Sequence, residues 1–140
     1  MRTYPKPKGG DGMIYLASPY SAADPAVRQW RFEAACQATA AMIRDGRPVF
    51  SPVVHSHPLT RYGLPVEWEF WERYDRAYMA ACREFAILTL EGWKESKGVK
   101  AEIHIAAELR LPLYLIDPVK VGIRTESDPA LVAGSDGGAA

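Results

Sequence analysis

The chain has 140 residues, the length of one domain, and its 17 basic and 17 acidic residues cancel to a formal net charge of zero. This balance gives no general attraction for a nucleic acid polymer or an anionic membrane, and no apolar run approaches the roughly 20 residues that cross a bilayer. The first twelve residues lack the apolar stretch of a secretory signal, so we expect a cytoplasmic protein that acts on a small molecule.

Strands and helices alternate along the first half of the chain. A short apolar strand is predicted over 13–17. Asp24-Pro25 then has the pattern of a helix start, and apolar residues recur at helical spacing until Asp45-Gly46. A second strand is predicted over 48–50. Residues 53–65 are expected to form a long loop, since this segment holds two histidines and two prolines.

The second half repeats the alternation and sets the fold class. An aromatic helix is predicted over 66–82, a strand over 85–90, a helix over 98–110 and a last strand over 113–116. Alternating strands and helices indicate an α/β fold with right-handed crossovers. We therefore predict a doubly wound, flavodoxin- or Rossmann-like parallel sheet of four to five strands, with helices on both faces.

Three segments follow from this pattern. Residues 1–12 are predicted to be a flexible N-terminal segment and residues 13–118 to form the domain. Residues 119–140 are rich in glycine and polar side chains, so they are predicted to be a flexible tail.

Glu102 is the carboxylate with the strongest case for a function. If Gly98 opens a helix, helical spacing puts Glu102 on the same face as Val99. Helical side chains lean toward the N-terminus, so Glu102 would point toward the end of the preceding strand, where open α/β sheets hold ligands. The alternative is a boundary residue that reaches water, since desolvating an unpaired carboxylate is costly. We favour catalysis, because a surface helix gains nothing from this placement.

The start of the same helix is a candidate anion site. Ser96 is an expected N-cap, and Gly98 lets the backbone approach a ligand, so free N–H groups there could hold a phosphate or a carboxylate. Simple capping explains the same residues equally well, because a Ser-x-Gly at a helix start is common.

Three other residues are candidates for the same crevice. Tyr15 lies in an apolar strand and must satisfy its hydroxyl, which a bond to Glu102 would do. Asp75 lies in an aromatic helix, where the alternative is an ion pair with a neighbouring arginine. A Glu72–Arg76 pair would leave Asp75 free for another role. Trp71 offers a flat surface for a base, although aromatics at helical spacing more often belong to a core.

His55 and His57 are the candidates on the loop after the second strand. Residues i and i+2 of an extended loop point to one side, so both are expected to line the pocket as hydrogen-bond donors. A metal site is not predicted, because no further ligand pattern accompanies the two histidines.

Together these motifs resemble the nucleoside 2-deoxyribosyltransferase-like superfamily, which includes the 2′-deoxynucleoside 5′-phosphate N-hydrolases and small bacterial relatives of unassigned function. The resemblance covers roughly residues 13–116. It rests on Ile14-Tyr15-Leu16-Ala17-Ser18, on Asp75, and on Ser96-x-Gly98-x-x-x-Glu102. One departure is the first loop, Ser18-Pro19-Tyr20-Ser21, which stands where the nucleotide hydrolases have a shorter, glycine-rich loop. Recognition of a phosphate therefore stays open.

The resemblance implies an enzyme that cleaves or transfers the N-glycosidic bond of a nucleoside or nucleoside 5′-monophosphate. It implies Glu102 as nucleophile with a glycosyl-enzyme intermediate, Tyr15 in support, Asp75 on the sugar or base, and phosphate contacts from Ser96 and Gly98, joined by Ser18. No cofactor is needed, and a homodimer or homotetramer is expected. The alternative from another class is a non-catalytic nucleotide-binding or sensor module that uses the same crevice.

Overall fold

The fold is built on one parallel sheet. The computed structural model describes residues 12–133, and within them the sheet has four strands in the order β2-β1-β3-β4. The strands are β1 (Ile14–Ala17), β2 (Val49–Phe50), β3 (Glu84–Leu88) and β4 (Leu113–Ile116). The α/β class and the doubly wound parallel arrangement are therefore confirmed.

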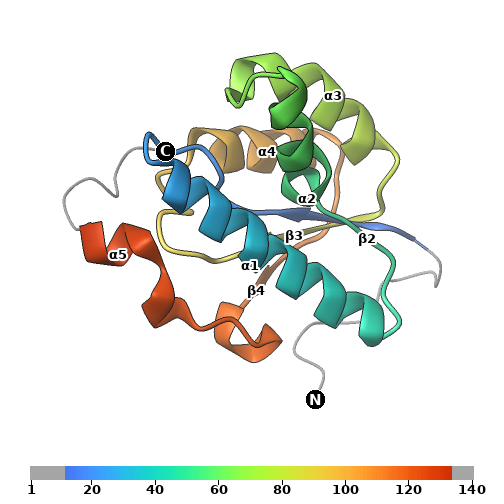
Figure 1. Ribbon diagram of the computed structural model, residues 1–140. Helices are drawn as coiled ribbons and strands as arrows, with labels where there is room; N and C mark the ends of the chain where they lie inside the picture. The colour runs from blue at the N-terminus through green and yellow to red at the C-terminus, as the bar shows by residue number, and fades with distance from the viewer. Residues whose placement is uncertain (1–11, 134–140) are drawn as a thin grey trace.

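Helices cover both faces of this sheet (Figure 1). The α-helices are α1 (Pro25–Arg44), α2 (Pro52–Ser56), α3 (Trp68–Ala80), α4 (Lys97–Glu108) and α5 (Pro129–Ala133), and the 3-10 helices are η1 (His57–Tyr62), η2 (Pro118–Val121) and η3 (Thr125–Ser127). Successive residues of a strand point to opposite faces. Ile14 and Leu16 accordingly pack with α1, whereas Tyr15 and Ala17 pack with residues of α3 and α4.

The segment expected to be a long loop is largely helical. Residues 53–65 contain most of α2 and all of η1, so the prediction of a loop is wrong there. The physical reason is a cap followed by a proline. The Ser51 hydroxyl accepts a hydrogen bond from the N–H of Val54, and Pro52 occupies the first helical position, where its missing N–H costs nothing.

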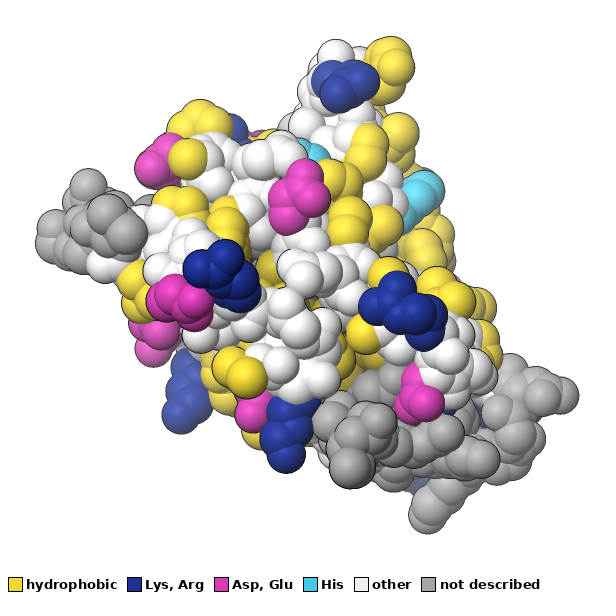
Figure 2. All heavy atoms as spheres, turned by 60° about the horizontal axis from the view of Figure 1, so that its bottom comes forward, with side chains coloured by type: hydrophobic (Ala, Val, Ile, Leu, Met, Phe, Trp, Pro, Cys, Tyr) yellow, Lys and Arg dark blue, Asp and Glu magenta, His cyan; other side chains and the backbone are white. Residues whose placement is uncertain are grey.

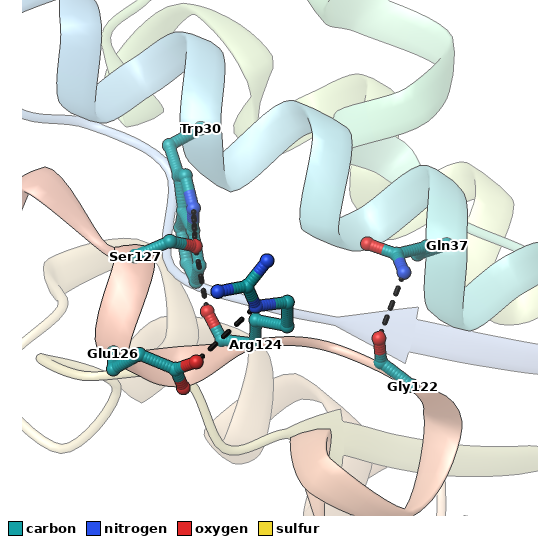
Figure 3. Close-up of polar contacts among 6 residues, drawn as sticks. All are labelled: Trp30, Gln37, Gly122, Arg124, Glu126 and Ser127. Atoms are coloured by element: carbon teal, nitrogen blue, oxygen red, sulfur yellow. Dashed lines mark hydrogen bonds and ion pairs between the residues drawn. The ribbon is translucent and has the colours of Figure 1, made fainter.

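The chain after β4 is also ordered over part of the predicted tail. Val121 and Ile123 are buried in the same cluster as the apolar face of α1, so the prediction of a flexible tail is wrong for residues 119–131. Figure 3 shows polar contacts that hold this segment to α1. The Trp30 indole N–H donates to Ser127 Oγ at 3.0 Å, and the Gln37 amide donates to the carbonyl oxygen of Gly122 at 2.8 Å. The flexibility predicted for residues 1–11 and 134–140 lies outside the described residues.

The surface is mixed in charge. On the face that Figure 2 presents, basic and acidic side chains alternate with apolar ones and do not gather into a patch of one sign. Within residues 12–133, no helix is both long enough and apolar enough to span a bilayer.

A buried arginine ties two loops to α1. Arg31 is fully buried, and its guanidinium donates to the carbonyl oxygen of Ser21 at 3.0 Å and to that of Glu91 at 3.1 Å. These carbonyls belong to the loops that follow β1 and β3. Gly92 lies against the same guanidinium with a φ of +89°, and an added Cβ there would lie 2.8 Å from Arg31 Nη2. The close approach and the left-handed backbone both require glycine at this position.

We predict that Gly92→Ala destabilises the protein more than Gly46→Ala. Gly46 also has a positive φ of +82°, but a Cβ there meets no atom within 4 Å, so it carries the backbone strain alone. Strain should cost each variant about 1–2 kcal/mol. Gly92→Ala should lose about 1–2 kcal/mol more, because the guanidinium must abandon a carbonyl. Denaturant unfolding of the two variants measures the difference, and equal losses would contradict the bridging role of Arg31.

Candidate active site

A pocket lies where the strand order reverses. Loops after β1 and β2 and the start of α4 surround it, at the carboxyl ends of the strands, where doubly wound sheets hold their ligands. About 450 Å³ of space lies between its atoms, part of it open to solvent. Six predicted site residues line it: Ser18, Trp71, Asp75, Ser96, Gly98 and Glu102.

Glu102 lies at the floor of the pocket, where its carboxyl group accepts a hydrogen bond that joins β1 to α4. The Tyr15 hydroxyl donates to Glu102 Oε2 at 2.6 Å, and both residues are buried. The expected bond between these two side chains is confirmed. Tyr15 itself does not line the pocket. Its ring is held between Phe50 of β2 and Phe85 of β3, with ring centroids 6.0 and 5.9 Å away, so the hydroxyl has a fixed position.

Asp75 brings a second buried carboxylate to the same floor. It is 7% exposed, and it forms no ion pair with any cation of the described residues. The neighbouring Arg76 pairs instead with Glu72 at 3.6 Å and with Glu108 of α4 at 3.0 Å. The alternative of an ion pair for Asp75 is therefore wrong, because Arg76 lies on the exposed side of α3.

Burial decides the protonation of these groups. It raises the pKa of Glu102 well above the ordinary value, the charge of Asp75 raises it further, and the hydrogen bond from Tyr15 acts in the opposite direction. Burial also raises the pKa of Asp75, to about 7, again against an opposing effect of Tyr15. The pKa of Tyr15 is raised by burial and by both carboxylates, so the phenol keeps its proton and can donate it.

The start of α4 forms one wall. Ser96 caps the helix by accepting a hydrogen bond from the N–H of Val99 at 3.2 Å, as the capping interpretation predicts. A Cβ added to Gly98 would lie 3.7 Å from the Trp68 ring, an ordinary contact. No protein neighbour therefore demands glycine there, and the space above it is open to a ligand.

Ser18 adds a polar group that lacks a partner. Its hydroxyl oxygen is buried in the pocket wall, and within the described residues no hydrogen-bond partner satisfies it. A buried polar group without a partner costs free energy, which a ligand that reaches it would recover.

The two predicted histidines do not line the pocket. His55 is exposed, and its ring contacts those of Phe50 and Tyr78. His57 Nδ1 lies 2.6 Å from the Tyr20 hydroxyl, and Nε2 lies 3.0 Å from the Gln29 side-chain oxygen. The prediction that both histidines point into the pocket is wrong, because residues two apart on a helix face different directions.

Further side chains line the pocket outside the predicted set: Tyr20, Ser21, Pro52, Val53, Ser56, Val66 and Trp68. Tyr20 is two residues beyond Ser18 in a loop that the sequence already places at the crevice. The position of that loop was therefore the feature of the sequence from which Tyr20 could have been predicted to line the pocket. Trp68 reaches the pocket from the first turn of α3, which puts two tryptophans of one helix at the wall. Within residues 12–133, no group of three or more His, Cys, Asp or Glu side chains could hold a metal ion.

We predict that Asp75 makes stability fall as the pH rises from about 4 to about 7. The pKa of Asp75 is about 7 in the folded chain against an ordinary 3.8, so in this range the folded state binds more protons than the unfolded state. Raising the pH then favours unfolding, by up to about 4 kcal/mol. Over this pH range, the difference in unfolding free energy between wild type and Asp75→Asn should change by this amount. The exposed control Glu95→Gln should keep the wild-type dependence of unfolding free energy on pH. If wild type and Asp75→Asn show the same dependence on pH, the assignment to Asp75 is contradicted.

Sequence comparison places the site inside a recognised family. A family model described as Domain of unknown function (DUF1937) matches residues 12–117, which contain all four strands of the sheet and the whole pocket lining. None of the curated proteins matches the chain. Because the match covers more than half of the sequence, the chain belongs to the family of proteins that carry the domain DUF1937.

Proposed function

We propose that the protein cleaves or transfers the N-glycosidic bond of a nucleoside or a nucleoside 5′-monophosphate, with Glu102 as the nucleophile. The observation that carries the proposal is the 2.6 Å bond from Tyr15 to Glu102 at the pocket floor. Burying a carboxylate in this way fixes its direction and removes it from water, which lowers the stability of the fold but suits a catalytic group. The resemblance to the nucleoside 2-deoxyribosyltransferase-like superfamily supports the same role.

The first chemical step forms a glycosyl-enzyme. Glu102 attacks the anomeric carbon through an oxocarbenium-like transition state, which its negative charge stabilises, and the bond from that carbon to the base nitrogen breaks. The base leaves with the electron pair and takes a proton from Asp75. In the second step, water or another base attacks the anomeric carbon. Asp75 then accepts the proton of the attacking group, and Glu102 is released as a carboxylate.

The environment of the two acids supports this division of roles. Two carboxylates that share a buried site do not both ionise easily, so one proton stays with the pair near neutral pH. Tyr15 donates a hydrogen bond to Glu102, which stabilises the ionised form that attacks. The proposed reaction needs the shared proton on Asp75, from which the departing base takes it.

The walls suit a flat base next to a sugar. Trp71 is anchored by a hydrogen bond from its indole N–H to the carbonyl oxygen of Pro65 at 2.7 Å, and Trp68 packs beside Gly98. Aromatic rings provide stacking surfaces for a nucleobase, and the Ser18 hydroxyl is available for a polar group of the sugar.

We predict that Glu102→Gln abolishes turnover while the fold remains. Removing the nucleophile should lower kcat/KM by about 1,000-fold or more, because no covalent intermediate can form. Release of free base from a panel of nucleosides and 5′-monophosphates is followed by chromatography, and intact mass spectrometry detects the added sugar on the protein. Glu108→Gln, on the exposed side of the same helix, is the matched control. Tight binding by the wild type without release of base would favour the non-catalytic nucleotide-binding module.

We predict that Gly98→Ala impairs the ligand site without harming the fold. Alanine is the better helix former by about 1 kcal/mol, and its Cβ meets only ordinary contacts, so the unfolding free energy should stay equal or rise. The methyl group occupies the place where a ligand would approach the backbone, so KM should rise about tenfold or more. Equal KM values for wild type and variant would show that the start of α4 does not contact the ligand.

A further inference from the structure

A line of hydrogen bonds runs from the surface of α1 to the pocket wall. The Gln29 side-chain nitrogen donates to Glu33 Oε2 at 2.9 Å, and the Gln29 oxygen lies 3.0 Å from His57 Nε2. His57 Nδ1 lies 2.6 Å from the hydroxyl of Tyr20, which lines the pocket with Asp75 and Glu102. None of these four residues takes part in the steps proposed above.

The chemistry of each group fixes where the protons lie. An ionised carboxylate only accepts hydrogen bonds, so Glu33 faces the nitrogen of Gln29 and leaves the amide oxygen toward His57. That oxygen also only accepts, so the ring proton of a neutral His57 is on Nε2. Nδ1 is then a bare acceptor, and the hydroxyl that it can bind is that of Tyr20 acting as donor.

The surroundings keep His57 neutral. Burial lowers the pKa of His57, the cations of Arg28 and Arg61 lower it further, and the carboxylate of Glu33 acts in the opposite direction. The ring also lies on Phe32, with centroids 4.4 Å apart. Burial raises the pKa of Tyr20 against the effect of Arg28, so Tyr20 keeps the proton that it donates.

We infer that Tyr20 positions the substrate by accepting a hydrogen bond from one of its O–H or N–H groups, and that His57 sets this preference by holding the Tyr20 proton. The inference rests on the proposed function and narrows the substrate to a nucleoside that presents a sugar hydroxyl or a base amino group at this wall. A phosphate oxygen at the same place finds no proton on the Tyr20 hydroxyl to accept.

The direction of the hydrogen bonds is tested without any substrate. Nitrogen-15 NMR of the histidine side chains distinguishes the two neutral tautomers. At neutral pH we expect His57 in the Nε2–H form, and we expect Tyr20→Phe to shift the Nδ1 signal of His57. The signals of His55, which has no bond to Tyr20, serve as the internal reference and should stay in place. An Nδ1–H tautomer, or a fully protonated ring, would overturn the inference even if the protein proves to be an N-glycosidase.

The substrate contact is tested by a cycle of protein and ligand changes. Tyr20→Phe should lower kcat/KM for the best nucleoside by about 5- to 10-fold. With wild type, an analogue that lacks the contacted group should show a kcat/KM lower by a similar factor. With Tyr20→Phe, removing that group from the substrate should lower kcat/KM no further. Analogues without the base amino group, the 3′-hydroxyl or the 5′-hydroxyl separate the possible sources. Tyr62→Phe, on an exposed ring, is the control and should leave kcat/KM unchanged.

His57→Phe separates positioning from packing. The phenyl ring can keep the contact with Phe32 but cannot accept the Tyr20 proton, so Tyr20 becomes a donor and the 5′-monophosphate should gain relative to the nucleoside. An unchanged ratio of the two substrates, or an equal loss by Tyr20→Phe for every analogue, would overturn the inference. The same set of variants and analogues is also compared by Kd, measured by calorimetry in the Glu102→Gln background. If the Kd values change in the expected pattern but the wild type releases no base, the proposed reaction is rejected and the assignment of Tyr20 is kept.

Discussion

A carboxyl group that cannot reach water needs a partner, and Glu102 finds one in Tyr15. The 2.6 Å bond between them joins the central strand β1 to α4, and Asp75 from α3 completes the same floor. One polar contact inside an otherwise apolar cluster therefore joins β1 to α4, and α3 contributes Asp75 to the same pocket. A burial of this kind weakens the fold unless each charge is satisfied, so its presence in so small a domain argues for chemistry.

The pocket has two ends with different hydrogen-bonding character. At the floor, burial raises the pKa values of two acids, Asp75 and Glu102. At the wall, Tyr20 faces the pocket with its own proton held by His57. Arg31 connects the two ends mechanically, since it anchors the loop after β1, which carries Tyr20, to the loop before α4, which carries Glu102. The ligand would thus be held between a proton source and a proton acceptor on a rigid frame.

The sequence was sufficient for the floor of the site and insufficient for its wall. Helical spacing put Glu102 on the buried face of α4, and the need of a buried phenol for a partner led to Tyr15. The direction of His57 depends on α2, whose start was visible as Ser51-Pro52 in the same form as Asp24-Pro25. Asp117-Pro118 repeats that signal just before the segment predicted to be a flexible tail, and Asp128-Pro129 repeats it within that segment. The bond from His57 to Tyr20 joins separate turns of chain, and no local pattern announces such a contact.

The strand order has a consequence for the chain as it is made. β1 pairs with β3, and their partnered residues, such as Ile14 and Glu84, are 70 positions apart. On the ribosome, β1 can meet β2 early but must wait for β3, which follows about 4 to 14 seconds after β1 at ordinary rates of synthesis. During that interval the apolar edge of β1 has no neighbour. The nascent chain is then most exposed to mispairing and most in need of a chaperone, although the finished domain is small.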